Sequence, residues 1–93
     1  MNFTGTDLNS LSLVNCTLPK PSFAKVLWNA ARIQASEFIQ ADFSQAQLLD
    51  ARIEDAKLTG ANFHKAELKG AQISDTDLTQ AELSQSDLSD TVI

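Results

Sequence analysis

The chain has 93 residues, of which 43% are hydrophobic and 20% are charged, a composition typical of one folded soluble domain rather than of a disordered tail or a membrane span. Its net charge of −5 argues against direct binding to nucleic acid or to an anionic membrane, because both need basic patches. A single cysteine, Cys16, excludes an internal disulfide and a cysteine-cluster zinc site.

The beginning of the chain shows no sign of a targeting segment. Its first ten residues contain no basic run followed by an apolar core, and no stretch of the chain approaches the length of a transmembrane helix. We therefore expect a cytoplasmic protein. We expect Cys16 to be a small buried apolar residue, with a reactive thiol as the alternative.

A large apolar residue occupies every fifth position from Phe3 to Ile93, and we call these nineteen positions the centres. A run of this kind does not arise by chance in a chain of this hydrophobic content. A period of five fits neither the 3.6 residues of a helical turn nor the period of two of a strand. The sequence therefore predicts a solenoid built from five-residue repeats.

Along the chain, residues 1–28 are expected to form a less regular first coil and residues 29–93 a regular series of repeats. In the first part, the slot two positions before a centre holds relatively large side chains: Leu11, Cys16, Pro21 and Val26. In the second part the same slot holds alanine, serine or threonine. One large and one small inward side chain per repeat suits a narrow interior packed to native density.

The position two residues after a centre frequently carries glycine, asparagine or aspartate, as at Gly5, Asn15 and Asp50. These residue types tolerate the backbone of tight turns. We therefore expect a corner of the chain at the end of each pentapeptide.

The repeats resemble those of the pentapeptide-repeat family, in which a small residue and a polar residue precede the central Leu or Phe. Two close matches are Ala41-Asp42-Phe43-Ser44-Gln45 and Ala61-Asn62-Phe63-His64-Lys65. The resemblance implies an all-β fold, a right-handed quadrilateral β-helix of about 4.5 coils of 20 residues, with residues 1–93 as a single domain and all nineteen centres buried. It implies no catalytic residues and no cofactor.

In a four-sided coil of 20 residues, residues n and n+20 stack on each other, and the centres can be sorted accordingly. One face then collects Phe3, Phe23, Phe43, Phe63 and Leu83, and another collects Leu13, Ile33, Ile53, Ile73 and Ile93. We expect the phenylalanine rings to stack and the isoleucines to support strand-like pairing. With coils about 4.8 Å apart, the solenoid would be a rod about 22 Å long.

One face of the predicted coil is selectively acidic. The side centred on Leu8, Trp28 and Leu48 holds five carboxylates against one lysine, Lys69. Leu27 occupies a normally polar position beside Trp28, and Leu49, one coil further on, is expected to lie near it. We predict a partner-binding surface made of Leu27, Trp28, Leu49, Asp50, Glu67, Asp87 and Asp90. The alternatives are a widened or partly capped first coil for the apolar residues and simple solubility for the acidic ones.

The residues offer little for catalysis or metal binding. His64 is the only histidine and stands in an outward position, and Glu54 and Asp55 are expected to line a convex wall without the cleft that acid–base chemistry needs. We therefore expect no enzyme activity, no metal and no cofactor, but an adaptor that binds another protein.

Two other functions stay open. One is a DNA mimic that binds a type II topoisomerase (gyrase), as the resemblance to the quinolone-resistance members of the family implies. The other is a rod that serves only as part of a larger assembly. We also expect an end-to-end homodimer through the N-terminal end, with Leu11, Val14 and Pro19, because residues 71–93 carry five carboxylates and no base.

Overall fold

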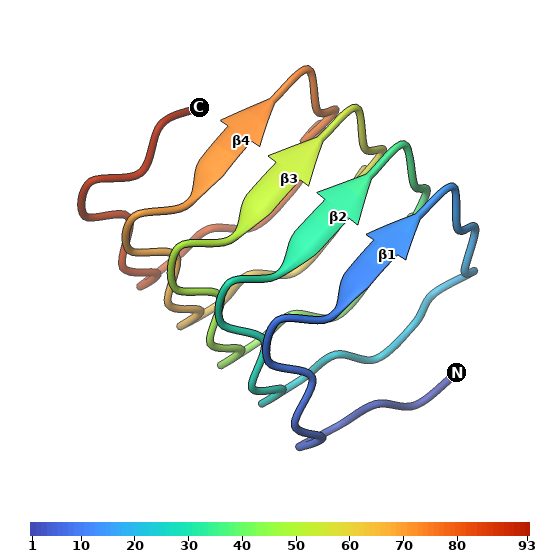
Figure 1. Cartoon of the computed structure of the whole chain (residues 1–93), viewed down its shortest axis with the longest axis horizontal. Helices are drawn as coiled ribbons and strands as arrows, with labels where there is room; N and C mark the ends of the chain where they lie inside the picture. The colour runs from blue at the N-terminus through green and yellow to red at the C-terminus, as the bar shows by residue number, and fades with distance from the viewer.

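The computed structural model describes residues 1–93, which wind into a right-handed square coil whose turns stack on one another (Figure 1). One wall of the coil is a parallel sheet of four short strands, in the order β1-β2-β3-β4. The strands are β1 (Ser12–Val14), β2 (Arg32–Gln34), β3 (Arg52–Glu54) and β4 (Gln72–Ser74). The two termini lie at opposite ends of the stack in Figure 1. No helix of the structure has the length and apolar character to cross a membrane.

Neighbouring coils are related by twenty residues on all four walls. In the sheet, Leu13 pairs with Ile33, which pairs with Ile53. The other three walls are joined by isolated parallel bridges with the same spacing, of which Asp42 with Asn62 is one. The predicted stacking of residues n and n+20 is therefore confirmed.

A left-handed backbone forms every corner of the coil. Every fifth residue from Gly5 to Asp90 has a positive φ, fifteen residues with side chains and three glycines in total. At three of the four corners the carbonyl of the centre accepts a hydrogen bond from the residue three positions later, as Phe43 does from Ala46 at 3.0 Å. The corner after the sheet wall lacks this bond, and there Cys16 donates its backbone N–H to the hydroxyl of Ser36 at 3.1 Å.

The phenylalanines stack along the interior as predicted. Ring centroids lie 5.1 Å apart between Phe3 and Phe23, 5.0 Å between Phe23 and Phe43, and 4.9 Å between Phe43 and Phe63. The last two rings are nearly parallel, with an angle of 3° between their planes. Small residues such as Ala41 and Ala61 are also buried, and they fill the space beside the stack.

The expectation that all nineteen centres are buried is wrong at the two ends of the stack. Eleven centres from Phe23 to Ile73 are buried, whereas Phe3 and Leu78 are only half-buried and Leu88 and Ile93 are exposed. A side chain in an end coil has a neighbouring coil on one side only, so the repeat position alone does not bury it.

The molecule is also not a rod. Its three extents are 28, 27 and 24 Å, because the width of a square coil with its side chains equals the length of so short a stack. The protein is a block with four flat walls and two ends.

Candidate interaction surface

The predicted surface lies on the wall that precedes the sheet in each coil, and we call this wall the acidic face. Its outward side chains form three rows that run from coil to coil. The first row, linked by parallel bridges, consists of Asp7, Leu27, Gln47, Glu67 and Asp87. The second row consists of Asn9, Asn29, Leu49, Lys69 and Ser89, and the corner row of Ser10, Ala30, Asp50, Gly70 and Asp90.

The acidic residues of the prediction all lie on this face. Glu67 and Asp87 are direct neighbours in the first row, and Asp50 and Asp90 lie in the corner row. All four are exposed, and none of them forms an ion pair, because the only pairs in the molecule are Lys57 with Glu37 and His64 with Glu82. The acidic face therefore carries a concentrated excess of negative charge, with Lys69 as its one cation.

Leu27 and Leu49 are both half-buried on this face, in adjacent coils but in different rows. Leu27 stacks on Gln47 in the first row, and Leu49 stacks on Asn29 in the second row. The side-chain amide of Asn29 donates to Gln47 Oε1 at 3.4 Å. This polar pair crosses between the two rows that hold the leucines.

Trp28 has to be removed from the predicted surface. Its side chain is fully buried, and its ring centroid lies 5.1 Å from that of Phe23. The indole N–H donates to the carbonyl of Leu11 at 3.0 Å, so its one polar atom is satisfied inside the coil. Trp28 thus fills the interior of the second coil, where Val26 is also fully buried in a slot that the next two coils give to Ala46 and Ala66.

The carboxylate of Asp87 accepts two hydrogen bonds from Ser89, two residues later in the chain. The hydroxyl of Ser89 donates to Asp87 Oδ1 at 2.6 Å and its backbone N–H donates to the same atom at 2.9 Å. These two hydrogen bonds stabilise the carboxylate and lower the pKa of Asp87 below its ordinary value. Asp87 therefore keeps its charge into more acidic solution than a free aspartate does.

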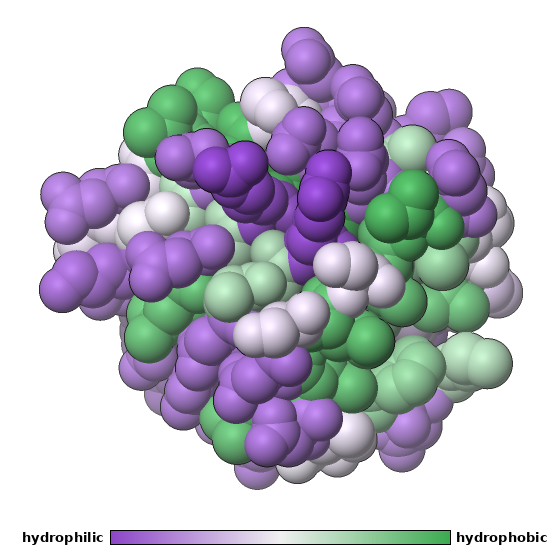
Figure 2. All heavy atoms as spheres, viewed as in Figure 1, coloured by the Kyte–Doolittle hydropathy of each residue, from purple (hydrophilic) through white to green (hydrophobic).

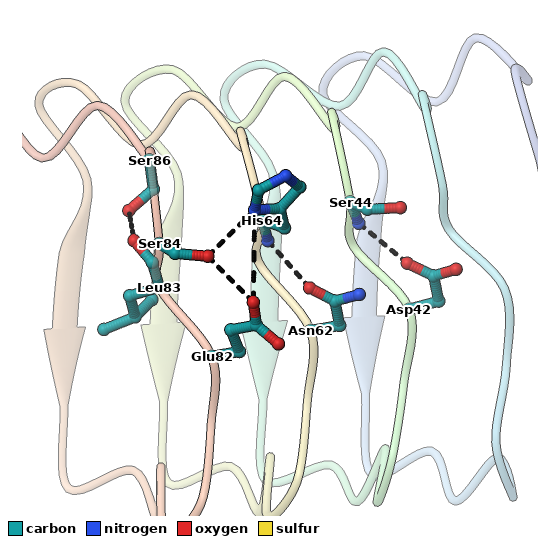
Figure 3. A network of polar contacts seen from close by, with 8 residues as sticks. All are labelled: Asp42, Ser44, Asn62, His64, Glu82, Leu83, Ser84 and Ser86. Atoms are coloured by element: carbon teal, nitrogen blue, oxygen red, sulfur yellow. Dashed lines mark hydrogen bonds and ion pairs between the residues drawn. The ribbon is translucent and has the colours of Figure 1, made fainter.

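The sequence did not point to the polar cluster around His64, on the wall that precedes the acidic face (Figure 3). His64 Nδ1 lies 2.8 Å from the hydroxyl of Ser84, and that hydroxyl donates to Glu82 Oε1, also at 2.8 Å. Since the serine proton is directed to Glu82, Ser84 accepts from His64. This is the reverse of the arrangement in which a histidine activates a serine nucleophile.

The structure has two hollows, and both lie at the C-terminal end of the stack around Ile73 and Val92. Neither is lined by a residue of the acidic face. The candidate surface is accordingly flat, and it suits contact with a macromolecule better than enclosure of a small ligand.

The walls, corners and interior define a β-solenoid with five residues per side. A comparison with protein families matches residues 29–64 and 66–93 to pentapeptide repeats, in eight copies. The matched segments make up more than half of the chain, which therefore belongs to the pentapeptide-repeat family. No curated protein matches the chain in a comparison of sequences.

Solved structures with the same fold include Rfr23, a pentapeptide repeat protein of the cyanobacterium Cyanothece 51142, with a TM-score of 0.68 and 25% identity over 94% of this chain and 63% of that one. A trypsin-treated form of QnrB1, a plasmid-mediated fluoroquinolone resistance protein, gives a TM-score of 0.66 and 20% identity over 97% of this chain and 59% of that one. The chain thus spans less than two thirds of either structure.

A third similar structure is a pentapeptide repeat protein from the thylakoid lumen of Arabidopsis thaliana. It gives a TM-score of 0.51 and 23% identity over 96% of this chain and 69% of that one. The identities to this protein and to QnrB1 are low, so these two likenesses establish the fold alone.

Proposed function

We propose that the chain is a non-catalytic module that binds another protein through the acidic face. The observation that carries the proposal is the set of exposed carboxylates, including Asp50, Glu67 and Asp87, that share one flat wall with a single lysine. An excess of charge of one sign steers a partner of opposite charge and fixes its register on the surface. Leu27 and Leu49 add two half-buried apolar side chains to the contact.

Two further features support a non-catalytic role. His64 lies on an open wall, and Ser84 beside it donates its proton to Glu82 rather than to the imidazole. General acid–base chemistry works best where a pocket removes water from the reacting groups, and the acidic face is flat.

The test replaces acidic residues of this face by lysine in the triple variant D50K/E67K/D90K. Lysine suits the corner positions, because Lys25 and Lys65 adopt the same left-handed backbone, with φ of 57° and 58°. The matched control carries the same charge change on the sheet wall, E54K/D55K/D75K. Its residues likewise make no side-chain hydrogen bond or ion pair.

The wild type and both variants are used as baits in lysate of the source cell, and each retained protein is then purified and titrated against all three. We expect a partner whose dissociation constant rises at least tenfold with the acidic-face variant and less than twofold with the control. Equal retention by the wild type and the acidic-face variant would show that this face does not carry the binding.

A second function, mimicry of DNA on a type II topoisomerase, is supported by the acidic face and by the shared fold with QnrB1. The density of charge favours the adaptor instead. DNA carries about one charge per 1.7 Å, so a mimic about 22 Å long would present on the order of 13 charges, whereas this face presents five carboxylates.

We therefore expect no inhibition of gyrase supercoiling at sub-micromolar protein. The opposite result would favour mimicry: inhibition in that range, relieved by added salt and lost when Asp50, Glu67 and Asp87 are neutralised.

A further inference from the structure

The sheet wall carries an arginine and a glutamate that have no ionic partner within the molecule. Arg52 and Glu54 stand at the two ends of β3, on either side of the buried Ile53, and both point outward. Arg52 is exposed and Glu54 is half-buried, and neither forms an ion pair. Figure 2, viewed toward the sheet wall, shows strongly hydrophilic side chains gathered across its middle.

The outward side chains of this wall form two rows, one on each side of the buried centres. The row before the centres consists of Ser12, Arg32, Arg52, Gln72 and Val92, and the row after the centres consists of Val14, Gln34, Glu54 and Ser74. Asp55 and Asp75 occupy the corner beyond the second row. With two arginines and three carboxylates, the sheet wall lacks the strong charge excess of the acidic face.

A two-fold axis parallel to the stack makes the two rows complementary. If the axis lies over the centres of the sheet wall, each coil stays level with the same coil of a second copy, and the row before the centres faces the row after them. Arg52 of each copy then faces Glu54 of the other, so the contact contains the same ion pair twice. Two sheets pack about 10 Å apart face to face, a gap that an arginine and a glutamate side chain bridge together.

The remaining facing pairs bring no like charges together. They are Ser12 with Val14, Arg32 with Gln34, and Gln72 with Ser74. Within one copy Arg32 donates to Gln34 Oε1 at 3.2 Å, and in the dimer Gln34 of the second copy offers the same acceptor. The closest like charges are Asp55 and, across the contact, Asp50. Both are exposed corner residues at the rim, where solvent and the neighbouring Arg52 reduce their repulsion.

The other three walls do not fit a second copy of themselves in this way. The acidic face also holds opposite charges in facing rows, Glu67 and Lys69, but its five carboxylates against one lysine make two such faces repel each other. On the remaining two walls the same symmetry places charged side chains opposite uncharged ones, for example Glu37 opposite Ile39. The charges of the sheet wall therefore select the sheet wall of a second copy as their partner.

We infer that two copies of the chain bind side by side through their sheet walls, with parallel stacks, and that two ion pairs between Arg52 and Glu54 hold the contact. Four coils and five residues per side give the wall roughly 19 by 16 Å, less than the usual area of about 800 Å² per partner, so the association is weak and reversible. The sequence instead predicts a dimer contact at the N-terminal end. The acidic faces of this side-by-side dimer point away from each other, and the inference does not depend on the function proposed for them.

Reversal of the two charges tests the pairing. R52E and E54R each place like charges opposite each other in a homodimer, whereas a mixture of the two variants restores opposite charges in a heterodimer. The swapped variant R52E/E54R restores them within one protein. The matched control K65E makes the same change of charge as R52E on another wall, at a lysine that forms no ion pair.

Sedimentation velocity at low salt, from about 10 μM to about 1 mM protein, measures the weak association expected for a contact of this size. Amides that shift with protein concentration in NMR spectra locate the contact. Thermal melting monitored by circular dichroism shows whether each variant is folded.

We expect wild type, K65E and R52E/E54R to dimerise with dissociation constants within about threefold of one another. R52E and E54R should each dimerise at least tenfold more weakly, and their equimolar mixture at least tenfold more tightly than either variant alone. Amides of β1 to β4 should shift with concentration, and added salt should weaken the dimer.

Three results would overturn the inference: a wild type that stays monomeric up to about 1 mM, equal dimerisation of wild type and folded R52E, or no heterodimer in the mixture of folded R52E and E54R. Concentration-dependent shifts confined to the N-terminal end of the stack would also overturn it, and would assign the dimer to the end-to-end contact that the sequence predicts.

Discussion

Aspartate and asparagine in the position before a centre hydrogen-bond to the backbone of their own wall. Asp42 Oδ1 accepts the backbone N–H of Ser44 at 2.9 Å, and Asn62 Oδ1 accepts that of His64 at the same distance (Figure 3). These short side chains satisfy an N–H that points away from the coil, as in an Asx turn. The polar position of the repeat therefore contributes to the shape of each wall as well as to solubility.

This role predicts a dependence of stability on pH at Asp77 and Asp87. Hydrogen bonds from Thr79 and Ser89, respectively, lower the pKa of both carboxyl groups in the folded state. Because the pKa of each carboxyl group is lower in the folded chain than in the unfolded chain, its charged form stabilises the fold. This stabilisation is complete above the unfolded pKa of about 3.9 and is lost as the pH falls through the folded pKa.

The variant D77N/D87N keeps the Oδ1 acceptor at each of the two positions, but its side-chain amides cannot titrate. We expect the free energy of unfolding of the wild type to fall relative to that of D77N/D87N as the pH decreases from about 5 to about 2. Urea titrations at several pH values measure this difference. Parallel curves for the two proteins would rule out a stabilising role for the charged carboxylates.

Corner residues give a second prediction at this scale. Ala35 has a φ of 52°, and a left-handed backbone costs a residue with a Cβ about 1 kcal/mol relative to glycine. The greater freedom of glycine in the unfolded chain offsets part of this gain. We therefore expect Ala35→Gly to stabilise the protein by up to about 1 kcal/mol in urea denaturation.

The reverse change, from a corner glycine to alanine, should destabilise the protein. Its cost should depend on how closely the neighbouring coil approaches the new Cβ. A Cβ at Gly5 meets nothing within 4 Å, one at Gly60 lies 3.3 Å from Gln40 Cγ, and one at Gly70 collides with the carboxylate of Asp50. We expect the cost of Gly→Ala to increase in that order. Combining Asp50→Ala with Gly70→Ala should recover part of the loss, and a strictly additive result would contradict the proposed collision.

At the scale of the elements, the phenylalanine stack is the main stabilising feature. Phe63 is fully buried, with its ring 4.9 Å from that of Phe43. Replacing Phe63 by alanine should cost about 3–5 kcal/mol, as ring deletions in cores do. Phe3→Ala should cost less, because Phe3 is half-buried and has one ring neighbour.

His64, the next residue along the chain, is the matched control for Phe63. Its side chain points outward and bonds to Ser84, so His64→Ala should change the free energy of unfolding by less than about 0.5 kcal/mol. Equal losses for Phe63→Ala and His64→Ala in urea denaturation would contradict the inward and outward assignments.

The regular elements could be predicted because each depends on one repeat position. A centre that recurs every five residues fixes the inward direction, and sorting the centres by twenty residues identified both the phenylalanine stack and the strands. The hydrogen bonds of Asp42 and Asn62 also have a sequence signal, since an Asx residue stands one position before a centre in several repeats.

Features that depend on two coils at once were not predictable in this way. Trp28 was assigned to a surface because Leu27, beside it, occupies a normally polar position. Its burial depends on features of two coils, among them the carbonyl of Leu11 in the first coil that accepts its indole N–H. Leu27 and Leu49 share a wall, yet one precedes and the other follows a centre. The hydrogen bond between Asn29 and Gln47, which crosses between their rows, could be seen only once the positions of both rows were known.

At the scale of the whole molecule, stability is distributed unevenly along the stack. The centres from Phe23 to Ile73 are buried, while those of the end coils are partly exposed. In a solenoid each coil contacts only its neighbours, so local unfolding proceeds from the ends. The two ends differ in charge: residues 71–93 contain five carboxylates and no basic residue, whereas residues 1–20 contain one aspartate and one lysine.

Repulsion within the C-terminal end should make its opening sensitive to salt. The screening length falls from about 30 Å at 0.01 M salt to about 3 Å at 1 M. Over this range we expect sodium chloride to slow hydrogen exchange of the backbone amides of Ile73 and Asp87, which donate to carbonyl groups of neighbouring coils. The amides of Phe3 and Leu8, at the less charged end, should respond much less.

A matched variant separates this charge effect from the general effects of concentrated salt. In D75N/D90N the C-terminal end loses two charges but keeps side chains that suit a left-handed corner. The salt dependence of exchange at Ile73 and Asp87 should shrink in this variant while that at Phe3 stays the same. Two results would contradict the role of repulsion between the carboxylates in opening the C-terminal coil. One is that salt slows the exchange of all amides to the same degree; the other is that the salt dependence of exchange in D75N/D90N equals that in the wild type.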